Sequence, residues 1–284
     1  MAVEERALAS GLDALDIPVA PRVSRGRKLW RSAWPKLLAI GIFLFVWQFL
    51  IWIEWRPSYA LASPSQTFHA LFDNWSLIWE AMGRTLGRAV KGYTIAIVIG
   101  VVIGALVARI PVLRAAIGSM ITGLQTMPSV AWFPFALVVF KLSEGAITFV
   151  IVIGAAPAIA NGLINGIDNI PPVLLRAGRV LGAKRVDGFR YVVLPAALPA
   201  FVGGLKQGWA FAWRSLLAAE VIGGITGYSL GQQLQVNKDN ADIAGLQAVM
   251  VVIFVIGVVM DIVVFGYLER TIRRRYGLVD AAAA

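Results

Sequence analysis

The sequence predicts an all-α, polytopic membrane bundle with six transmembrane helices. The chain has 284 residues, of which 58% are hydrophobic and 15% charged, whereas soluble domains are about 45–50% apolar and about 25% charged. The apolar residues gather in long runs of the kind that cross a bilayer. The six runs cover residues 37–53, about 85–108, 112–140, 145–165, 195–222 and 244–268.

The basic residues predict the orientation of these spans. If the N-terminus is inside, 18 of the 26 lysines and arginines fall in the N-terminal segment, two inner connections and the C-terminal segment. The outer loops then hold only Arg56, Arg84, Lys141 and Lys238. Because cytoplasmic loops carry the excess of Lys and Arg, both termini are expected in the cytoplasm. The net charge of +10 therefore indicates topology rather than nucleic-acid binding.

Two parts are expected along the chain. Residues 1–36 form a basic cytoplasmic tail with an interfacial helix, and residues 37–284 form the transmembrane domain, with its core at about 80–270. The basic region and the first apolar run are too long for a typical signal peptide, so the first span is expected to stay uncleaved. After it, Ser63-Pro64-Ser65 is a helix-start signal, and residues 65–82 form an amphipathic segment expected on the outer interface.

Small and helix-breaking residues predict how the spans pack. Three glycine pairs spaced by four residues allow close helix approach, either within one bundle or, alternatively, against a second copy. These pairs are Gly100 and Gly104, Gly162 and Gly166, and Gly204 and Gly208. Pro128 and Pro134 are expected to break the third run and Pro157 the fourth, at places where neighbours or a wet cavity satisfy the freed carbonyls.

Enzyme signatures are absent from the sequence. There is no cysteine and one histidine, His69, which is expected on the surface, so thiol nucleophiles, disulfides and multi-histidine metal sites are excluded. The phosphate loop Gly-x-x-x-x-Gly-Lys-Ser/Thr and the elbow Gly-x-Ser-x-Gly are also missing. Energy for any transport must therefore come from a partner or a gradient.

The most informative stretch lies between the fourth and fifth runs, where residues 176–195 read RAGRVLGAKRVDGFRYVVLP. Pro171-Pro172 starts a helix at about 173–181, and Gly182 interrupts it. A second short helix at about 183–191 is expected to end ahead of Leu194-Pro195.

Two short helices at a glycine bend make a knob that can seat in a partner's cleft. Val186 and Phe189 are the expected apolar anchors, and Lys184, Arg185 and Arg190 form the basic rim. The alternative is a solvated loop whose charges only enforce topology.

The fifth run contains a second candidate site. Lys206, Trp209 and Trp213 lie at i, i+3 and i+7, on one helix face. A cation inside a span usually faces a cavity or a partner, and here it could offset the lost hydration of a small anion. Alternatively, Lys206 snorkels or pairs with an acid while the tryptophans pack. Glu220 could pair with Arg214 only if the helix is irregular, since six residues put them about 120° apart.

The pattern Ala177-Gly178-x-x-x-Gly182, nine residues, then Val192-x-Leu194-Pro195 resembles the cytoplasmic EAA loop of permease subunits from binding-protein-dependent ABC importers. Three further patterns look like the branch that imports nitrate, taurine and aliphatic sulfonates. They are Pro195-Ala-Ala-Leu-Pro199, Trp213-x-x-Leu216-x-x-x-Glu220 and Met127-Pro128-x-x-Ala131-x-x-Pro134. The resemblance covers roughly residues 60–270. Arg176 stands where the family usually has glutamate, and Gly178 where it has its second alanine.

The resemblance implies a MetI-like permease fold and a mechanism. Two copies of the permease, each docked through a coupling loop at about 168–194 on one of two cytoplasmic ATPase subunits, rock between inward- and outward-facing states. An extracytoplasmic binding protein delivers the substrate. The ATPase partner binds ATP and Mg, while this chain holds no cofactor and hydrolyses nothing. The expected location is the bacterial inner membrane.

The expected substrate is a small anion, with an aliphatic sulfonate ahead of nitrate, taurine or another small substrate. The residues expected to couple to the ATPase are Ala177, Gly178, Gly182, Ala183, Lys184, Arg185, Val186, Phe189, Leu194 and Pro195. Those expected along the translocation pathway are Met127, Pro128, Lys206, Trp209, Trp213 and Glu220. Two other classes stay open: a gradient-driven secondary carrier and a membrane-embedded enzyme.

Overall fold

The computed structural model describes residues 25–57, 60–184, 186–224 and 227–276. Within these ranges the regular elements are all helical, as the sequence predicts, and no β-strand occurs. The chain divides into two units, residues 1–56 and 57–284. The described part of the first unit is built on α2 (Arg25–Trp52), which runs through Pro35. The basic stretch after residue 24 is therefore helical together with the first apolar run, whereas residues 1–24 of the predicted tail lie outside the described residues.

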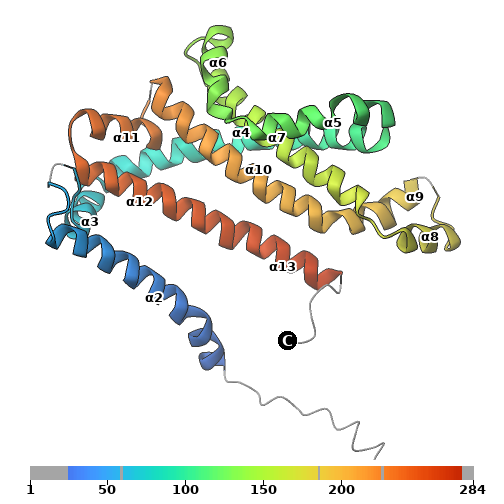
Figure 1. Cartoon of the computed structure of the whole chain (residues 1–284), viewed down its shortest axis with the longest axis horizontal. Helices are drawn as coiled ribbons and strands as arrows, with labels where there is room; N and C mark the ends of the chain where they lie inside the picture. Colours follow the sequence, from blue (N-terminus) through green and yellow to red (C-terminus); the bar gives the residue numbers. More distant parts are fainter. Residues whose placement is uncertain (1–24, 58–59, 185, 225–226, 277–284) are drawn as a thin grey trace, which may run out of the picture. The chain divides into compact units, whose positions relative to one another are not determined.

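The second unit holds the remaining helices (Figure 1). The short elements η1, η2 and η3 are a 3-10 turn and two π-helical turns. In chain order the elements are α3 (Pro64–Asp73), α4 (Trp75–Arg109), α5 (Pro111–Thr126), η1 (Ser129–Trp132), α6 (Phe133–Phe140), α7 (Glu144–Asp168), α8 (Pro172–Val180), α9 (Val186–Gly188), η2 (Phe189–Val193), α10 (Leu194–Gly223), α11 (Leu230–Asp239), α12 (Ile243–Val259), η3 (Met260–Phe265) and α13 (Gly266–Arg275).

Among the described residues, five helices are long and apolar enough to cross a membrane, or six if one bent pair counts as a span. The bent pair corresponds to the third apolar run. Its axis turns by 101° between Pro111–Thr126 and Ser129–Phe140. Pro128 lies at this turn, and Pro134 lies in the first turn of α6. The break predicted from these prolines is confirmed.

The centre of the second unit is α7, which packs between α4 and α10 (Figure 1). The contacts are close because glycines line the crossings. A Cβ on Gly100 would lie 2.8 Å from the carbonyl oxygen of Ala156, and Gly162 and Gly204 meet backbone to backbone. The glycine pairs therefore pack within one chain, which was the first of the two predicted arrangements.

The predicted break of the fourth run at Pro157 is wrong. The helix α7 continues through this proline, which is buried together with Ala156 and Ala158. Proline removes one backbone hydrogen bond, but a membrane helix tolerates that loss where neighbouring helices enclose it. Close packing against α4 and α10 provides this enclosure.

The predicted helix end ahead of Leu194-Pro195 is also wrong. The elements α9, η2 and α10 form one helical stretch, Val186–Gly223. Its π-helical turn ends at Val193, directly before α10, and Pro195 lies in the first turn of α10. A π turn shifts the hydrogen-bond register locally, and such adjustments let a membrane helix continue past a proline.

The amphipathic segment predicted at 65–82 is divided between two helices. Ser63 caps α3 in a capping box: its hydroxyl accepts from the Gln66 N–H at 3.3 Å, and its own N–H donates to Gln66 Oε1 at 2.9 Å. This confirms the predicted helix start. Asn74 separates α3 from α4, so the second span helix begins at Trp75, about ten residues before the predicted run.

Candidate functional site

The basic segment between α7 and α10 forms a bent structure that we call the elbow, residues 172–193. Its bend follows from the way α8 ends. Gly182 has φ +85°, its N–H donates to the Arg179 carbonyl at 3.1 Å, and the Ala183 N–H donates to the Gly178 carbonyl at 2.9 Å. This pair of bonds is a Schellman motif, which requires a left-handed residue and favours glycine there. The predicted bend at Gly182 is confirmed.

The two arms of the elbow pack on each other and on the end of α4. Gly178 is buried, and a Cβ there would lie 2.6 Å from a methyl group of Val192. The Arg109 guanidinium lies over the Phe189 ring, 4.8 Å from its centroid. A groove of about 450 Å³ between the arms is lined by Arg109, Phe189 and the buried side of α8. The Phe189 ring is thus engaged within this chain rather than fully presented to a partner.

The outer face of the elbow is apolar at its tip. Val186, the predicted anchor, is 75% exposed, and Val180 and Leu181 are 86% and 85% exposed. Sequence reasoning missed these two residues, although an apolar pair at a helix end beside Gly182 was the available signal. Lys184 is exposed beside them.

The other predicted coupling residues take different positions. Ala177 and Leu194 are exposed, whereas Ala183 and Pro195 are partly buried. Arg185 lies outside the described residues. The structure therefore brings most of the predicted set to one end of α10, around an exposed apolar tip.

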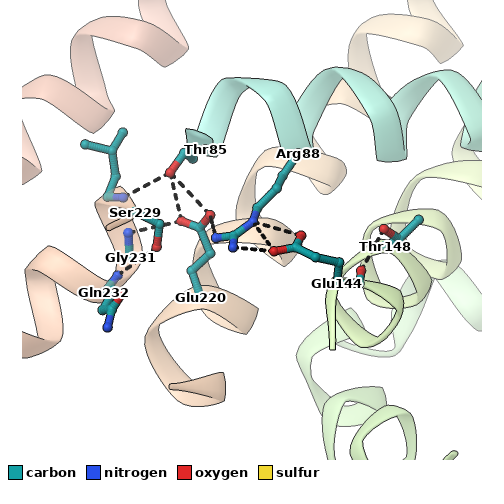
Figure 2. Close-up of polar contacts among 9 residues, drawn as sticks. Thr85, Arg88, Glu144, Thr148, Glu220, Ser229, Gly231 and Gln232 are labelled. Atoms are coloured by element: carbon teal, nitrogen blue, oxygen red, sulfur yellow. Dashed lines mark hydrogen bonds and ion pairs between the residues drawn. The ribbon is translucent and has the colours of Figure 1, made fainter. Parts of the chain in front are cut away.

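A charged cluster lies near the other end of α10, where Glu220 is buried. Its carboxylate accepts hydrogen bonds from Thr85 Oγ1 at 3.0 Å, from Arg88 Nη1 at 2.9 Å and from the Gly231 N–H at 3.1 Å (Figure 2). Arg88 also donates from Nε to Glu144 at 3.0 Å. One arginine thus joins the end of α10 to the start of α7.

The cluster also anchors the chain that follows α10. The Leu230 N–H donates to Thr85 Oγ1 at 2.9 Å, at the first residue of α11. Because Thr85 and Arg88 both come from α4, this helix contacts the acid of α10 and the start of α11 (Figure 2). Glu220 was predicted along the pathway, and the structure gives it these three hydrogen-bond donors.

Sequence reasoning missed Arg88 as the partner of Glu220 and considered only Arg214. The signal was present: an arginine inside an apolar run often pairs with a carboxylate, and Glu220 is the acid of the fifth run. What the sequence did not give is which turns of α4 and α10 face each other.

Two charged layers bracket the apolar part of the bundle. We call Arg88, Glu144 and Glu220 the Glu220 layer. The Asp168 layer is the ion pair between Arg114 and Asp168, 2.6 Å apart. The helix α7 begins at Glu144 and ends at Asp168, which puts the layers about 36 Å apart at about 1.5 Å per residue. A hydrocarbon core of about 30 Å fits between them.

On the predicted cationic face of the fifth run, Lys206 pairs with acids and the tryptophans pack, which was the alternative to an anion site. Lys206 Nζ lies 2.9 Å from Asp261 and 3.9 Å from Glu269. Trp209 and Trp213 are buried and stack with ring centroids 6.0 Å apart. The lysine thus pairs with acids from η3 and α13 while the tryptophans pack.

The remaining predicted pathway residues lie at the bend of the third run. Met127 follows α5 and is 43% exposed, and Pro128 follows it. Nearby, the Ser129 and Ser215 hydroxyls are hydrogen-bonded, which ties the bend to α10. The structure therefore brings the bend next to α10.

No group of three or more His, Asp or Glu side chains close enough to hold a metal ion occurs in the part of the chain that was described. The described second unit thus has an elbow with an exposed apolar tip at one end of α10 and a buried, hydrogen-bonded charged cluster near the other.

Comparisons with known proteins agree with this arrangement. Residues 80–274 match the family "Binding-protein-dependent transport system inner membrane component". The chain is 29% identical over 211 residues to the nitrate import permease protein NrtB of Leptolyngbya laminosa, covering 71% of this chain and 75% of that protein. It is 32% identical over 221 residues to the riboflavin transport system permease protein RibX of Chloroflexus aurantiacus, covering 74% and 79%.

A solved structure of the inward-facing MetNI methionine ABC transporter shares the fold. One of its chains superposes with a TM-score of 0.59 at 22% identity, covering 70% of this chain and 96% of that chain. With the family match over most of the span region, the conclusion is that this chain belongs to the inner-membrane permease subunits of binding-protein-dependent ABC importers.

Proposed function

We propose that two copies of this chain form the translocation pathway for a small anion, with an aliphatic sulfonate as the preferred candidate. Two cytoplasmic ATPase subunits drive the pair, and an extracytoplasmic binding protein delivers the substrate. The observation that carries the proposal is the elbow, which places exposed Val180, Leu181 and Val186 beside basic residues at one end of the bundle.

The elbow is suited to transmit force. Apolar side chains surrounded by charges are the usual composition of a docking surface. The arm that carries Val186 continues without interruption into α10, so a displacement of the elbow moves α10 as one lever. ATP binding in the partner would then rock α10 between inward- and outward-facing arrangements.

The orientation follows from the basic residues. The elbow carries Arg176, Arg179, Lys184 and Arg190, and α13 ends in three arginines. By the positive-inside rule these segments face the cytoplasm, with both termini on the same side. The Glu220 layer then faces the binding protein.

The choice of an anion rests on this chain's own residues, because the relatives differ in the charge of their substrates. NrtB is named for nitrate, an anion, and RibX for riboflavin, a neutral flavin. The sequence patterns around Met127, Pro195 and Trp213 resemble the nitrate, taurine and sulfonate branch.

The test is purification of the protein from its native host with its bound partners, followed by reconstitution in proteoliposomes. We expect an ATPase subunit to copurify and uptake of labelled taurine, an alkanesulfonate or nitrate to require both ATP and the binding protein. The purified chain alone should hydrolyse no ATP. Uptake driven by a proton or sodium gradient without the ATPase would contradict the proposal.

A further inference from the structure

Arg214 is a cation in the apolar part of α10, and no carboxylate of the described residues neutralises it as carboxylates neutralise Lys206 and Arg88. Lys206 pairs with Asp261, and Arg88 pairs with Glu220 and Glu144. Arg214 has no carboxylate partner among the residues whose positions the structure gives. Its Nε donates to the Ala210 carbonyl at 3.0 Å, and its guanidinium lies 5.0 Å from the centroid of the Phe211 ring.

Arg214 lies well inside the apolar slab. It precedes Glu220 by six residues, which is about 9 Å along the helix, and follows Lys206 by eight residues, about 12 Å. A charged side chain at this depth is costly and normally faces a cavity or a partner. Lys91 on α4 also has no carboxylate partner in the described residues, but it lies one turn from Arg88, only about 4.5 Å along the helix from the Glu220 layer.

The direction of the Arg214 side chain shows that it does not reach for the nearer layer. Side chains of a helix tilt toward its N-terminus, and both contacts of Arg214, with Ala210 and Phe211, precede it in α10. Since Glu220 follows Arg214, the guanidinium points away from the Glu220 layer and toward the middle of the slab. It therefore does not snorkel to the closer interface.

The guanidinium lies where two grooves adjoin. Both grooves run between α10 and the segment formed by α12 and η3, with volumes of about 720 and 520 Å³. They share Trp213, Arg214, Gly257 and Asp261 as lining residues. The smaller groove continues along α10 past Ala210 and Gln207 to Gly203, an exposed face of two small residues and one polar side chain.

Lipid contact does not account for this face. Glutamine and arginine side chains that face lipid hydrocarbon cost free energy, whereas side chains that line a water-filled pathway do not. The guanidinium has a planar fork of N–H donors that matches an oxyanion. Sulfonate, nitrate and carboxylate groups all carry oxygens that can accept two hydrogen bonds from one guanidinium.

We infer that Arg214 is the residue that binds the translocated oxyanion within the membrane, and that Lys206 is a structural cation held by Asp261. The inference rests on the proposed function and deepens it by naming the specificity-determining residue. The positive charge of Arg214 compensates the anion for its lost hydration. The anion then passes along the face of α10 that carries Gln207.

The experiment uses the complete transporter, with its ATPase subunits and binding protein, reconstituted in proteoliposomes. The variants are Arg214→Gln and Arg214→Lys, with Arg84→Gln as a control, since Arg84 is exposed and pairs with Glu80 one turn away. Initial rates of labelled taurine and nitrate uptake and binding-protein-stimulated ATP hydrolysis are measured in parallel.

Arg214→Gln should lower uptake roughly 10- to 100-fold, the range expected for losing a hydrogen bond to a charged group, while stimulated ATP hydrolysis changes less than about twofold. Arg214→Lys keeps the positive charge but loses the planar set of N–H donors, so its uptake rate should lie between those of Arg214→Gln and the unmodified protein. Arg84→Gln should transport normally.

Normal uptake by either Arg214 variant would overturn the inference. Equal losses of uptake and of stimulated ATP hydrolysis in both variants would also overturn it, because a residue that only supports assembly moves both together. If the unmodified complex imports neither probe in response to ATP, it is the proposed anion import that fails.

Discussion

At the scale of single residues, Glu220 stands out as a charged side chain that is buried in the described bundle. Its buried carboxylate accepts from Thr85, Arg88 and the Gly231 N–H. A buried charge is tolerated only when it is paired and hydrogen-bonded. These contacts therefore determine how α4, α10 and the start of α11 meet.

Glu220→Ala should destabilise the protein strongly, by about 3 kcal/mol or more, because it leaves Arg88 without its buried partner and two further donors unpaired. The matched variant is Glu144→Ala. The Glu144 side chain is 54% exposed, so its loss should cost less than about 1 kcal/mol. The measurement is the free energy of unfolding in mixed micelles. Similar costs for the two variants would show that burial of Glu220 is not what makes it important.

The sequence predicted some of these residues but not their partners. It identified Glu220 and Lys206 as unusual charges inside a span, which follows from composition alone. Their partners, Arg88 and Asp261, come from helices more than 50 residues away. Such pairings depend on which helix faces meet, and periodicity within one helix carries no information about that.

At the scale of elements, the helix crossings are set by glycine. Gly162 and Gly204 meet where α7 crosses α10, with no space for a side chain on either. Close backbone approach of this kind replaces the hydrophobic driving force that membrane helices lack.

Gly162→Ala should therefore push α7 and α10 apart and cost about 1–3 kcal/mol, the usual penalty for overpacking. The control is Gly118→Ala in α5, where an added Cβ meets nothing within 4 Å. That change should be neutral, or should stabilise by up to about 1 kcal/mol, since alanine favours a helix over glycine. Thermal denaturation in detergent compares the two, and a neutral Gly162→Ala would contradict the crossing as described.

The bend of the elbow also depends on one glycine. A Cβ at Gly182 meets no neighbour, so the constraint is its φ of +85° alone. Gly182→Val should strain the turn by about 1–3 kcal/mol and reduce both ATPase copurification and uptake, with membrane insertion intact. Asparagine tolerates the left-handed region better than most residues, so Gly182→Asn should retain more of both. Full uptake by the valine variant would count against the elbow's proposed docking role.

At this scale, the sequence predicted the effect of one proline correctly and of two prolines wrongly. Pro128 was interpreted correctly as a break, because an extended residue and a 101° turn accompany it. Pro157 and Pro195 were interpreted wrongly. Close packing around α7 and the π turn before α10 compensate for the backbone hydrogen bond that each proline removes. The residue type alone does not distinguish these environments.

At the scale of the whole molecule, the second unit combines the elbow at one end of α10 with the Glu220 layer near the other. About 39 Å of continuous helix separates Leu194 from Glu220, counted at about 1.5 Å per residue. The sequence predicted the membrane class, the number of apolar runs and the bend at Gly182, since all of these follow from composition and local pattern. It could not predict the close contacts of α4, α7 and α10, which join distant segments.

The most direct measurement for the central claim is site-specific cross-linking between the elbow and the ATPase. The chain has no cysteine, so Val186→Cys at the elbow and Phe72→Cys on α3, both highly exposed positions, give clean single-cysteine proteins. In the complex purified from the native host, a bifunctional thiol–amine reagent should join Val186→Cys to the ATPase subunit and leave Phe72→Cys unlinked to it. An ATPase adduct at residue 72 and none at residue 186 would contradict the account.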